Sequence, residues 1–166
     1  MEKIAITPSG VSLRDVNEKN MVIVGADGEK LEGDEKPSSE FLMHLKIYEQ
    51  RKDVNAVVHT HSAVATGFAF AGEKIKRLEG FGPIENPFIP MVEYYAPGTA
   101  ELAQSVSNAL KNEDIVLLKK HGVVACGDNL DTASLLAGFV EETAKIQFVS
   151  RLLSHEQTQA HLKHSI

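Results

Sequence analysis

Residues 55–61 read NAVVHTH, an apolar run that ends in two histidines separated by one residue. Its apolar, β-branched beginning predicts a strand. Side chains two positions apart on a strand point to the same face, so His59 and His61 present both imidazoles on one side of the strand end. That arrangement can chelate a metal. On this spacing alone the alternative stays open, that both rings are only polar residues at the end of a strand.

Helices and strands alternate on both sides of this stretch. Apolar β-branched runs predict strands near residues 3–7, 21–24, 90–94, 115–118 and 123–126, and Asp27-Gly28 predicts a hairpin turn. Capping residues and helical spacing predict helices over 39–51, 62–71, 99–110 and 130–153. The early hairpin and the clustered strands favour an α/β fold with a mixed, largely antiparallel central sheet sandwiched by helices over a doubly wound parallel sheet.

The length of 166 residues is that of one domain, which we expect to span residues 1–154, followed by a polar tail over 155–166. The net charge of −6 argues against a nucleic-acid partner. No apolar run has the roughly 20 residues of a membrane span, so we expect no membrane partner. Cys126 is the single cysteine, which fits a reducing compartment. We therefore expect a cytoplasmic protein.

His121 is the best candidate for a third metal ligand, because it follows an apolar run and precedes Gly122, where the backbone can approach a ligand closely. Three histidines with an open fourth position are typical of a catalytic zinc site, whereas structural sites are closed by four protein ligands. The alternative is a loop histidine beside two lysines. His44 is a fourth candidate, although its place in a predicted helix is equally that of a surface or core-edge residue.

Glu40 opens the predicted helix over 39–51, where the positive end of the helix dipole stabilises a carboxylate. Its simplest interpretation is therefore a residue that favours the helix start. Ser38 and Ser39, just before it, offer hydroxyl groups beside the unbonded N–H groups of a helix N-terminus, which suits a phosphate. A carboxylate next to a phosphate cradle is what a base acting on a phosphorylated substrate needs.

Five segments in this order resemble the class II aldolase/adducin family: ITPSG, KPSSE, DVNAVVHTHS, PGTAEL and KKHGVVACG. The resemblance runs from Ile6 to about Leu153. It implies a class II aldolase-like fold and a Zn²⁺ ion bound by His59, His61 and His121. It also implies Glu40 as the acid/base residue near the metal, and a substrate phosphate held by four residues: Ser9, Gly10, Ser38 and Ser39.

The implied activity is zinc-dependent cleavage of a phosphorylated ketose, similar to L-fuculose 1-phosphate, to dihydroxyacetone phosphate and an aldehyde. Two alternatives remain: a sugar-phosphate epimerase or dehydratase of the same superfamily, and a non-catalytic adducin-like or truncated relative. In related epimerases the residue matching Glu40 is typically Asp, so PSSE favours aldol chemistry. Family members usually have an N-terminal helix and a Gly-Asn-x-Ser segment before ITPSG, and we expect this chain to lack both.

Other departures concern tyrosines and a lysine. The tyrosines that such aldolases use have no clear counterparts, since the tail has none and only Phe81 lies near the matching place in the loop. Lys120 stands where asparagine is common. The loop over residues 73–98 is rich in proline and aromatic residues, more than a monomer needs in exposed connections. Relatives form cyclic tetramers, so we expect a homo-oligomer, most simply a tetramer, although these aromatics could instead fold back on their own core.

Overall fold

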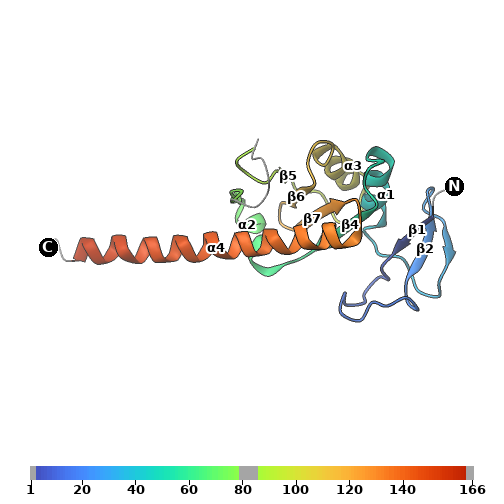
Figure 1. Cartoon of the computed structure of the whole chain (residues 1–166), viewed down its shortest axis with the longest axis horizontal. Helices are drawn as coiled ribbons and strands as arrows, with labels where there is room; N and C mark the ends of the chain where they lie inside the picture. The colour runs from blue at the N-terminus through green and yellow to red at the C-terminus, as the bar shows by residue number, and fades with distance from the viewer. Residues whose placement is uncertain (1–2, 79–85, 164–166) are drawn as a thin grey trace. The chain divides into compact units, whose positions relative to one another are not determined.

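A computed structural model describes residues 3–78 and 86–163 of the chain (Figure 1). The chain divides into two compact units, each assembled from two segments. Unit 1 comprises residues 1–52 and 95–111, and unit 2 comprises residues 53–94 and 112–166. Neither unit is continuous in sequence, so each one needs both of its segments to form. Phe81, which the sequence placed in the long loop, lies outside the described residues.

Unit 1 begins with a three-stranded antiparallel sheet of order β1-β2-β3. Its strands are β1 (Lys3–Ile6), β2 (Val22–Gly25) and β3 (Lys30–Glu32). The predicted Asp27-Gly28 turn joins β2 to β3, and Gly28 has φ +81°, a left-handed conformation that glycine adopts without strain. Ile6, Val22 and Val24 of these strands form a small core with Leu45, which comes from the helix that follows. The predicted hairpin is therefore confirmed.

Two helices complete unit 1, α1 (Phe41–Gln50) and α3 (Ala100–Ala109), which pack against each other. The buried Ser107 of α3 donates its hydroxyl to the Lys46 carbonyl at 3.0 Å, and also bonds the Gln50 side chain at 2.6 Å. Thr99 caps α3 by accepting from the Leu102 N–H at 3.3 Å, as its sequence predicts. α1 is shorter than expected, because Glu40 is its N-cap and lies just outside the helix.

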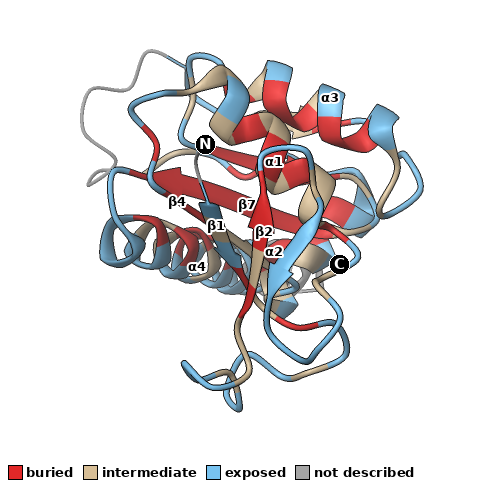
Figure 2. Ribbon diagram, turned by 90° about the vertical axis from the view of Figure 1, so that its right-hand side faces the viewer, coloured by how far each residue is buried: buried red, intermediate tan, exposed pale blue. Residues whose placement is uncertain are grey.

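Unit 2 contains a four-stranded sheet of order β4-β7-β6-β5. Its strands are β4 (Ala56–Thr60), β5 (Met91–Val92), β6 (Ile115–Leu118) and β7 (Gly122–Gly127). The β4–β7 and β6–β7 pairs are antiparallel, and β5 pairs with β6 in parallel. Every residue of β6 and β7 is buried, and Figure 2 shows β7 in the colour of buried residues. The predicted α/β fold with a mixed, largely antiparallel sheet is confirmed.

Two helices pack on the unit 2 sheet and on each other, α2 (Ala63–Ala71) and α4 (Leu130–Lys163). α4 buries a stripe of mostly small residues at helical spacing: Ala133, Ala137, Val140 and Ala144. Small side chains let the helix axis approach the strands closely. α4 also continues past the predicted end near Leu153 as far as Lys163, so much of the expected polar tail is helical. Within the described ranges, no helix is both long enough and apolar enough to cross a membrane.

Candidate metal and catalytic site

His59 lies on β4, and His61 follows the end of that strand. Their Nε2 atoms are 3.1 Å apart, so the period-two spacing does bring both rings together. His59 Nδ1 is 2.9 Å from the Val123 carbonyl oxygen on the neighbouring strand. Because a carbonyl oxygen only accepts hydrogen bonds, Nδ1 carries the hydrogen and Nε2 presents its lone pair. The fold therefore orients His59 with a ligand nitrogen toward His61.

The pairing of β4 with β7 brings His121 beside His59 and His61. β7 runs antiparallel to β4, with Thr60 opposite Val123, so the start of β7 lies beside the end of β4. The turn from β6 into β7 carries His121, whose backbone N–H bonds the Leu118 carbonyl at 3.0 Å. Its ring centroid is 4.8 Å from that of His59 and 5.0 Å from that of His61. One ligand nitrogen from each ring lies within 4.8 Å of the others.

Gly122 leaves the space that the three rings occupy. A Cβ atom at this position would lie 2.5 Å from the Thr60 carbonyl oxygen and 2.7 Å from His61 Cδ2. It would also lie 3.3 Å from His59 Cε1. Two of these contacts are closer than real Cβ atoms tolerate, so only glycine allows β7 to start beside the rings. The structure thus shows a close approach of Gly122 to the protein's own residues, whereas the predicted approach to a ligand stays a prediction.

The donor set fits a divalent metal. Zinc binds histidine nitrogens at about 2.0–2.1 Å, so two nitrogens of a tetrahedral zinc lie about 3.3 Å apart. The 3.1 Å between the Nε2 atoms of His59 and His61 is close to that edge. His121 Nδ1 is buried and has no hydrogen-bond partner among the described residues. Burial, with His61 nearby, lowers the pKa of His121, which favours the neutral ring that metals bind.

Glu40, in unit 1, is buried, with 8% of its surface exposed. Neither carboxylate oxygen makes a regular hydrogen bond with the described residues. Burial raises the pKa of Glu40, and the Gly98 backbone beside it offsets part of the shift. Gly98 has φ +75°, and a Cβ there would lie 2.9 Å from the Ser39 carbonyl oxygen. A buried carboxylate with few partners is typical of a functional group, because a structural one is normally hydrogen-bonded.

The four residues expected at the phosphate lie on two neighbouring segments of unit 1. The Ser38 N–H donates to the Thr7 carbonyl at 3.0 Å, and the Ser9 N–H donates to the Lys36 carbonyl at 2.9 Å. Gly10 follows with φ +75°. Ser9, Gly10 and Ser39 are exposed, and Ser38 is half-buried. The fold therefore brings ITPSG beside KPSSE, although residues 6–10 and 36–40 are far apart in sequence.

Part of the expected phosphate cradle is internally bonded. The Ser38 hydroxyl accepts from the Glu40 N–H at 3.2 Å, and the Ser38 carbonyl accepts from the Phe41 N–H at 3.1 Å. Two amides that the sequence offered to an anion thus already have partners. His44, the fourth histidine candidate, is not in the metal group. It is half-buried on α1, and burial lowers its pKa to about 4.

Sequence reasoning missed Glu141. This α4 residue accepts hydrogen bonds from the backbone at the start of α2, from Val64 and from Ala65, 77 and 76 residues away. No local pattern marks a cap supplied from so far along the chain.

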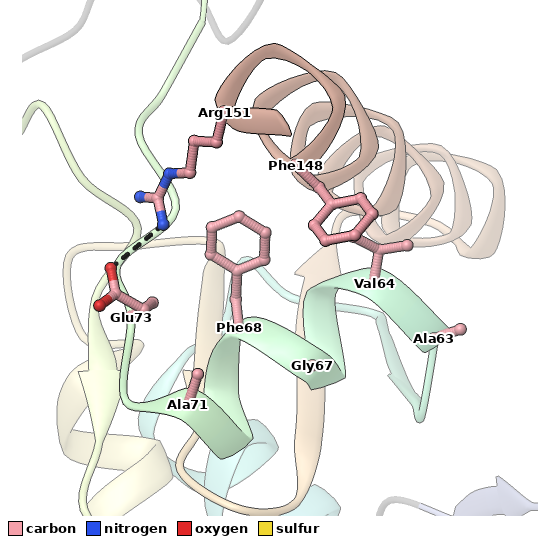
Figure 3. Close-up of a pocket in the computed structure, with 8 residues that line it drawn as sticks. All are labelled: Ala63, Val64, Gly67, Phe68, Ala71, Glu73, Phe148 and Arg151. Atoms are coloured by element: carbon pink, nitrogen blue, oxygen red, sulfur yellow. Dashed lines mark hydrogen bonds and ion pairs between the residues drawn. The ribbon is translucent and has the colours of Figure 1, made fainter. Parts of the chain in front are cut away.

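Unit 2 also has a separate pocket between α2 and α4, a cavity of about 390 Å³ (Figure 3). The rings of Phe68 and Phe148 face it, and Arg151 at its rim lies 5.0 Å from the centre of the Phe68 ring. Arg151 also pairs with Glu73 at 3.2 Å. None of the three histidines lines this pocket, so it is distinct from the metal group.

Comparison with known proteins identifies the family. The model of the class II aldolase and adducin N-terminal domain matches residues 1–148. The chain is 41% identical over 149 residues to an L-fuculose phosphate aldolase of Methanococcus vannielii, covering 88% of this chain and 78% of the relative. It is 34% identical over 148 residues to a 5-deoxy-D-ribulose 1-phosphate aldolase of Bacillus thuringiensis serovar kurstaki, covering 89% and 70%.

The fold leads to the same family. A solved L-fuculose 1-phosphate aldolase superposes with a TM-score of 0.82 at 33% identity, covering 91% of this chain and 71% of that one. The chain therefore belongs to the class II aldolase and adducin family, and it is a metal-dependent aldehyde-lyase.

Proposed function

We propose that this chain is a zinc-dependent aldolase that cleaves an L-fuculose 1-phosphate-like ketose phosphate to dihydroxyacetone phosphate and an aldehyde. The observation that carries the proposal is the group of three histidine nitrogens within 4.8 Å, built around Gly122. Three neutral imidazoles without a fourth protein ligand in the described group suit a catalytic zinc. When bound, the metal supplies Lewis-acid stabilisation of the negative charge that develops as the carbon–carbon bond breaks.

Glu40 is the proposed acid/base residue. Its raised pKa brings a carboxyl group closer to neutral pH, where it can both accept and return a proton. The proton it would move is the one at the carbon next to the ketose carbonyl. Few hydrogen bonds restrain its oxygens, which leaves them available to a substrate. The glutamate in PSSE, in place of the aspartate that is typical of related epimerases, supports aldol cleavage over epimerisation.

Ser9, Gly10, Ser38 and Ser39 are the proposed holders of the substrate phosphate. Backbone pairing of their two segments brings these small residues and hydroxyl groups close together within unit 1. Binding the phosphate there would orient the rest of the sugar for cleavage. Because two nearby amides are already bonded to Ser38, we expect hydroxyl groups to contribute more than the helix N-terminus.

A second substrate is supported by one specific observation. The Bacillus relative at 34% identity is named as a 5-deoxy-D-ribulose 1-phosphate aldolase, which acts on a shorter sugar with the same kind of bond to break. We therefore include 5-deoxy-D-ribulose 1-phosphate among the candidate substrates. A shared product, dihydroxyacetone phosphate, makes one assay sufficient for both.

A homotetramer in the cytoplasm is the proposed state of the enzyme. Among the described aromatics of the loop over residues 73–98, Tyr94 is 53% exposed and Phe88 is 37% exposed, which favours contacts with another subunit over packing on their own core. α4 also exposes large apolar side chains, including Leu135 at 75% and Ile146 at 57%. Light scattering tests the assembly: a concentration-independent mass of one chain, 18.1 kDa, would contradict it.

The activity test uses purified chain loaded with zinc and a panel of ketose 1-phosphates. We expect release of dihydroxyacetone phosphate from L-fuculose 1-phosphate or 5-deoxy-D-ribulose 1-phosphate, and loss of that release after metal removal by a chelator. Readdition of zinc should restore it. Conversion of a ketose phosphate into its epimer without cleavage would contradict the aldolase proposal, and so would full turnover in the metal-free protein.

A further inference from the structure

The start of α2 is held by a residue from another helix. Ser62 is the N-cap of α2, but its side chain makes no capping hydrogen bond, and its hydroxyl is buried without a partner among the described residues. The first N–H groups of a helix need an acceptor from elsewhere when the cap residue provides none. α2 obtains that acceptor from α4.

Glu141 is the acceptor. Its carboxylate receives the Val64 N–H at 3.2 Å and 3.1 Å, one distance for each oxygen, and the Ala65 N–H at 2.9 Å. Its side chain is only 14% exposed, and Lys145 lies 3.9 Å away on the same helix. A carboxylate bonded to the N–H groups of a helix N-terminus is a strong, charge-assisted contact, because the helix dipole is positive there.

The start of α2, which Glu141 caps, is two residues after His61 in the sequence. β4 ends at Thr60 and α2 begins at Ala63, so His61 and Ser62 form the whole connection between them. The β4 side is fixed by the pairing of Thr60 with Val123. The α2 side is fixed by Glu141. Because the connection has only two residues, the positions of Thr60 and Ala63 determine where the His61 backbone lies.

His61 has little else to hold it. The residue is exposed, and within the part of the chain that the structure describes the hydrogen bond and ring contacts of its imidazole are with the other two histidines, at 3.1 Å from His59 Nε2 and at 5.0 Å between ring centres with His121. His59, by contrast, is held by the Val123 carbonyl. The direction of the His61 ring therefore depends on its backbone, and through the backbone on where α2 starts.

We propose that Glu141 is a positioning residue, which holds His61 in metal-binding geometry by capping α2 from α4. This inference rests on the proposed metal function of the three histidines. A purely structural role for Glu141 predicts a different result, namely a lower melting temperature with unchanged metal coordination.

The test compares Glu141→Ala and Glu141→Gln with a matched control, Glu142→Ala. Glu142 is the adjacent carboxylate on α4, is 64% exposed and pairs with the same Lys145 at 2.8 Å. Zinc affinity is measured by competition with a chelator, and Co²⁺ absorption spectra report the coordination geometry, both well below the melting temperature. Supporting residues of metal ligands typically contribute 10- to 100-fold to affinity. Because Glu141 acts through the backbone, we expect about a 10-fold loss in Glu141→Ala with an altered Co²⁺ spectrum.

Glu141→Gln should lose less, since its amide oxygen can still accept one of the two N–H groups. Glu142→Ala should match the wild-type chain. If Glu141→Ala fails to fold, the Gln variant, which has the same shape, carries the comparison. Adding Ser62→Asn to Glu141→Ala should recover most of the affinity, because an N-cap side chain accepts from the same Val64 and Ala65 N–H groups.

Wild-type affinity and spectrum in both Glu141 variants would overturn the proposal, and so would an equal loss in Glu142→Ala. Failure of the proposed function itself has a different signature, because the wild-type chain would then bind neither Zn²⁺ nor Co²⁺. Hydrogen exchange of the Val64 and Ala65 amides in metal-free protein gives an independent readout. We expect faster exchange in Glu141→Ala, and unchanged protection would show that Glu141 does not cap α2 in solution.

Discussion

A side chain on residue 122 would collide with the Thr60 carbonyl oxygen, because an ideal Cβ on Gly122 lies 2.5 Å from it. Thr60 lies between His59, on β4, and His61, just after it, so this single close approach brings the start of β7 beside both histidines. Gly122 offers no ligand, but its lack of a side chain is what allows the three histidines to lie together.

Gly122→Ala should therefore affect both stability and metal binding. The added methyl group must push β7 away from β4, and overpacking of this kind costs about 1–3 kcal/mol in the free energy of unfolding. Urea unfolding measures that loss, and elemental analysis should find less bound zinc than in the wild-type chain. Gly138→Ala is the matched control, since a Cβ there meets nothing within 4 Å and α4 continues through it. It should gain about 0.5–1 kcal/mol. Equal effects in the two variants would contradict the steric role of Gly122.

His121→Ala should reduce bound zinc far below one equivalent, because it removes one of three imidazole donors. His44→Ala, on α1 and outside the group of three histidines, is the matched control and should keep stoichiometric zinc. Elemental analysis of both purified variants after dialysis makes the comparison. Full zinc occupancy in His121→Ala would show that the third ligand is another residue.

The histidine group was largely predictable from sequence, because its parts depend on local rules. The period of two along a strand places His59 and His61 together, and Gly122 marks a close approach. The Asp27-Gly28 turn and the Thr99 cap likewise depend on neighbours within a few residues. What the local rules could not supply was the register of β4 with β7, which brings His121 to the pair.

Other features escaped because distant parts of the chain decide them. Glu141 caps a helix 77 residues away in sequence. On α4 the buried face uses Ala133, Ala137 and Ala144, while the more hydrophobic Leu135 is 75% exposed. Hydrophobicity favours the leucine, but close packing on the strands favours alanine. Each unit also combines two separated segments, which composition does not reveal.

Glu40→Gln should keep its zinc and lose turnover. General acid–base catalysis typically contributes about 10²- to 10⁴-fold, and a neutral amide can replace the carboxyl group in shape but cannot transfer the proton. The measurement is the rate of dihydroxyacetone phosphate release together with zinc content. Wild-type turnover would remove Glu40 from the mechanism. A melting curve is needed alongside, because Glu40 is also the N-cap of α1.

The same variant should be more stable than the wild-type chain at neutral pH. Burial raises the pKa of Glu40 in the folded chain, so the folded state disfavours the ionised carboxylate. Stability of the wild-type chain is therefore lost as pH rises from the unfolded pKa, about 4.3 for glutamate, through the folded pKa. Urea unfolding should give a higher free energy of unfolding for Glu40→Gln than for the wild-type chain at pH 7, and the difference should be smaller at pH 4. A difference that grew on acidification would contradict the raised pKa.

Lys120 adopts φ +57°, and it is the non-glycine residue recorded with a positive φ among the described residues. The left-handed conformation costs most residues about 1–2 kcal/mol, is less costly for asparagine and is worst for β-branched residues. The Lys120 N–H donates to the Ala69 carbonyl at 3.2 Å, and this hydrogen bond holds the turn in the left-handed conformation at residue 120. The next residue in the turn is His121. Lys120→Asn should therefore raise the free energy of unfolding by about 0.5–1 kcal/mol, and Lys120→Val should lower it. Urea unfolding of the two variants under one set of conditions tests the sign of each change. Equal stability of the Asn and Val variants would mean that the turn does not hold residue 120 in the left-handed region, and the orientation of His121 toward the other two histidines would then need another cause.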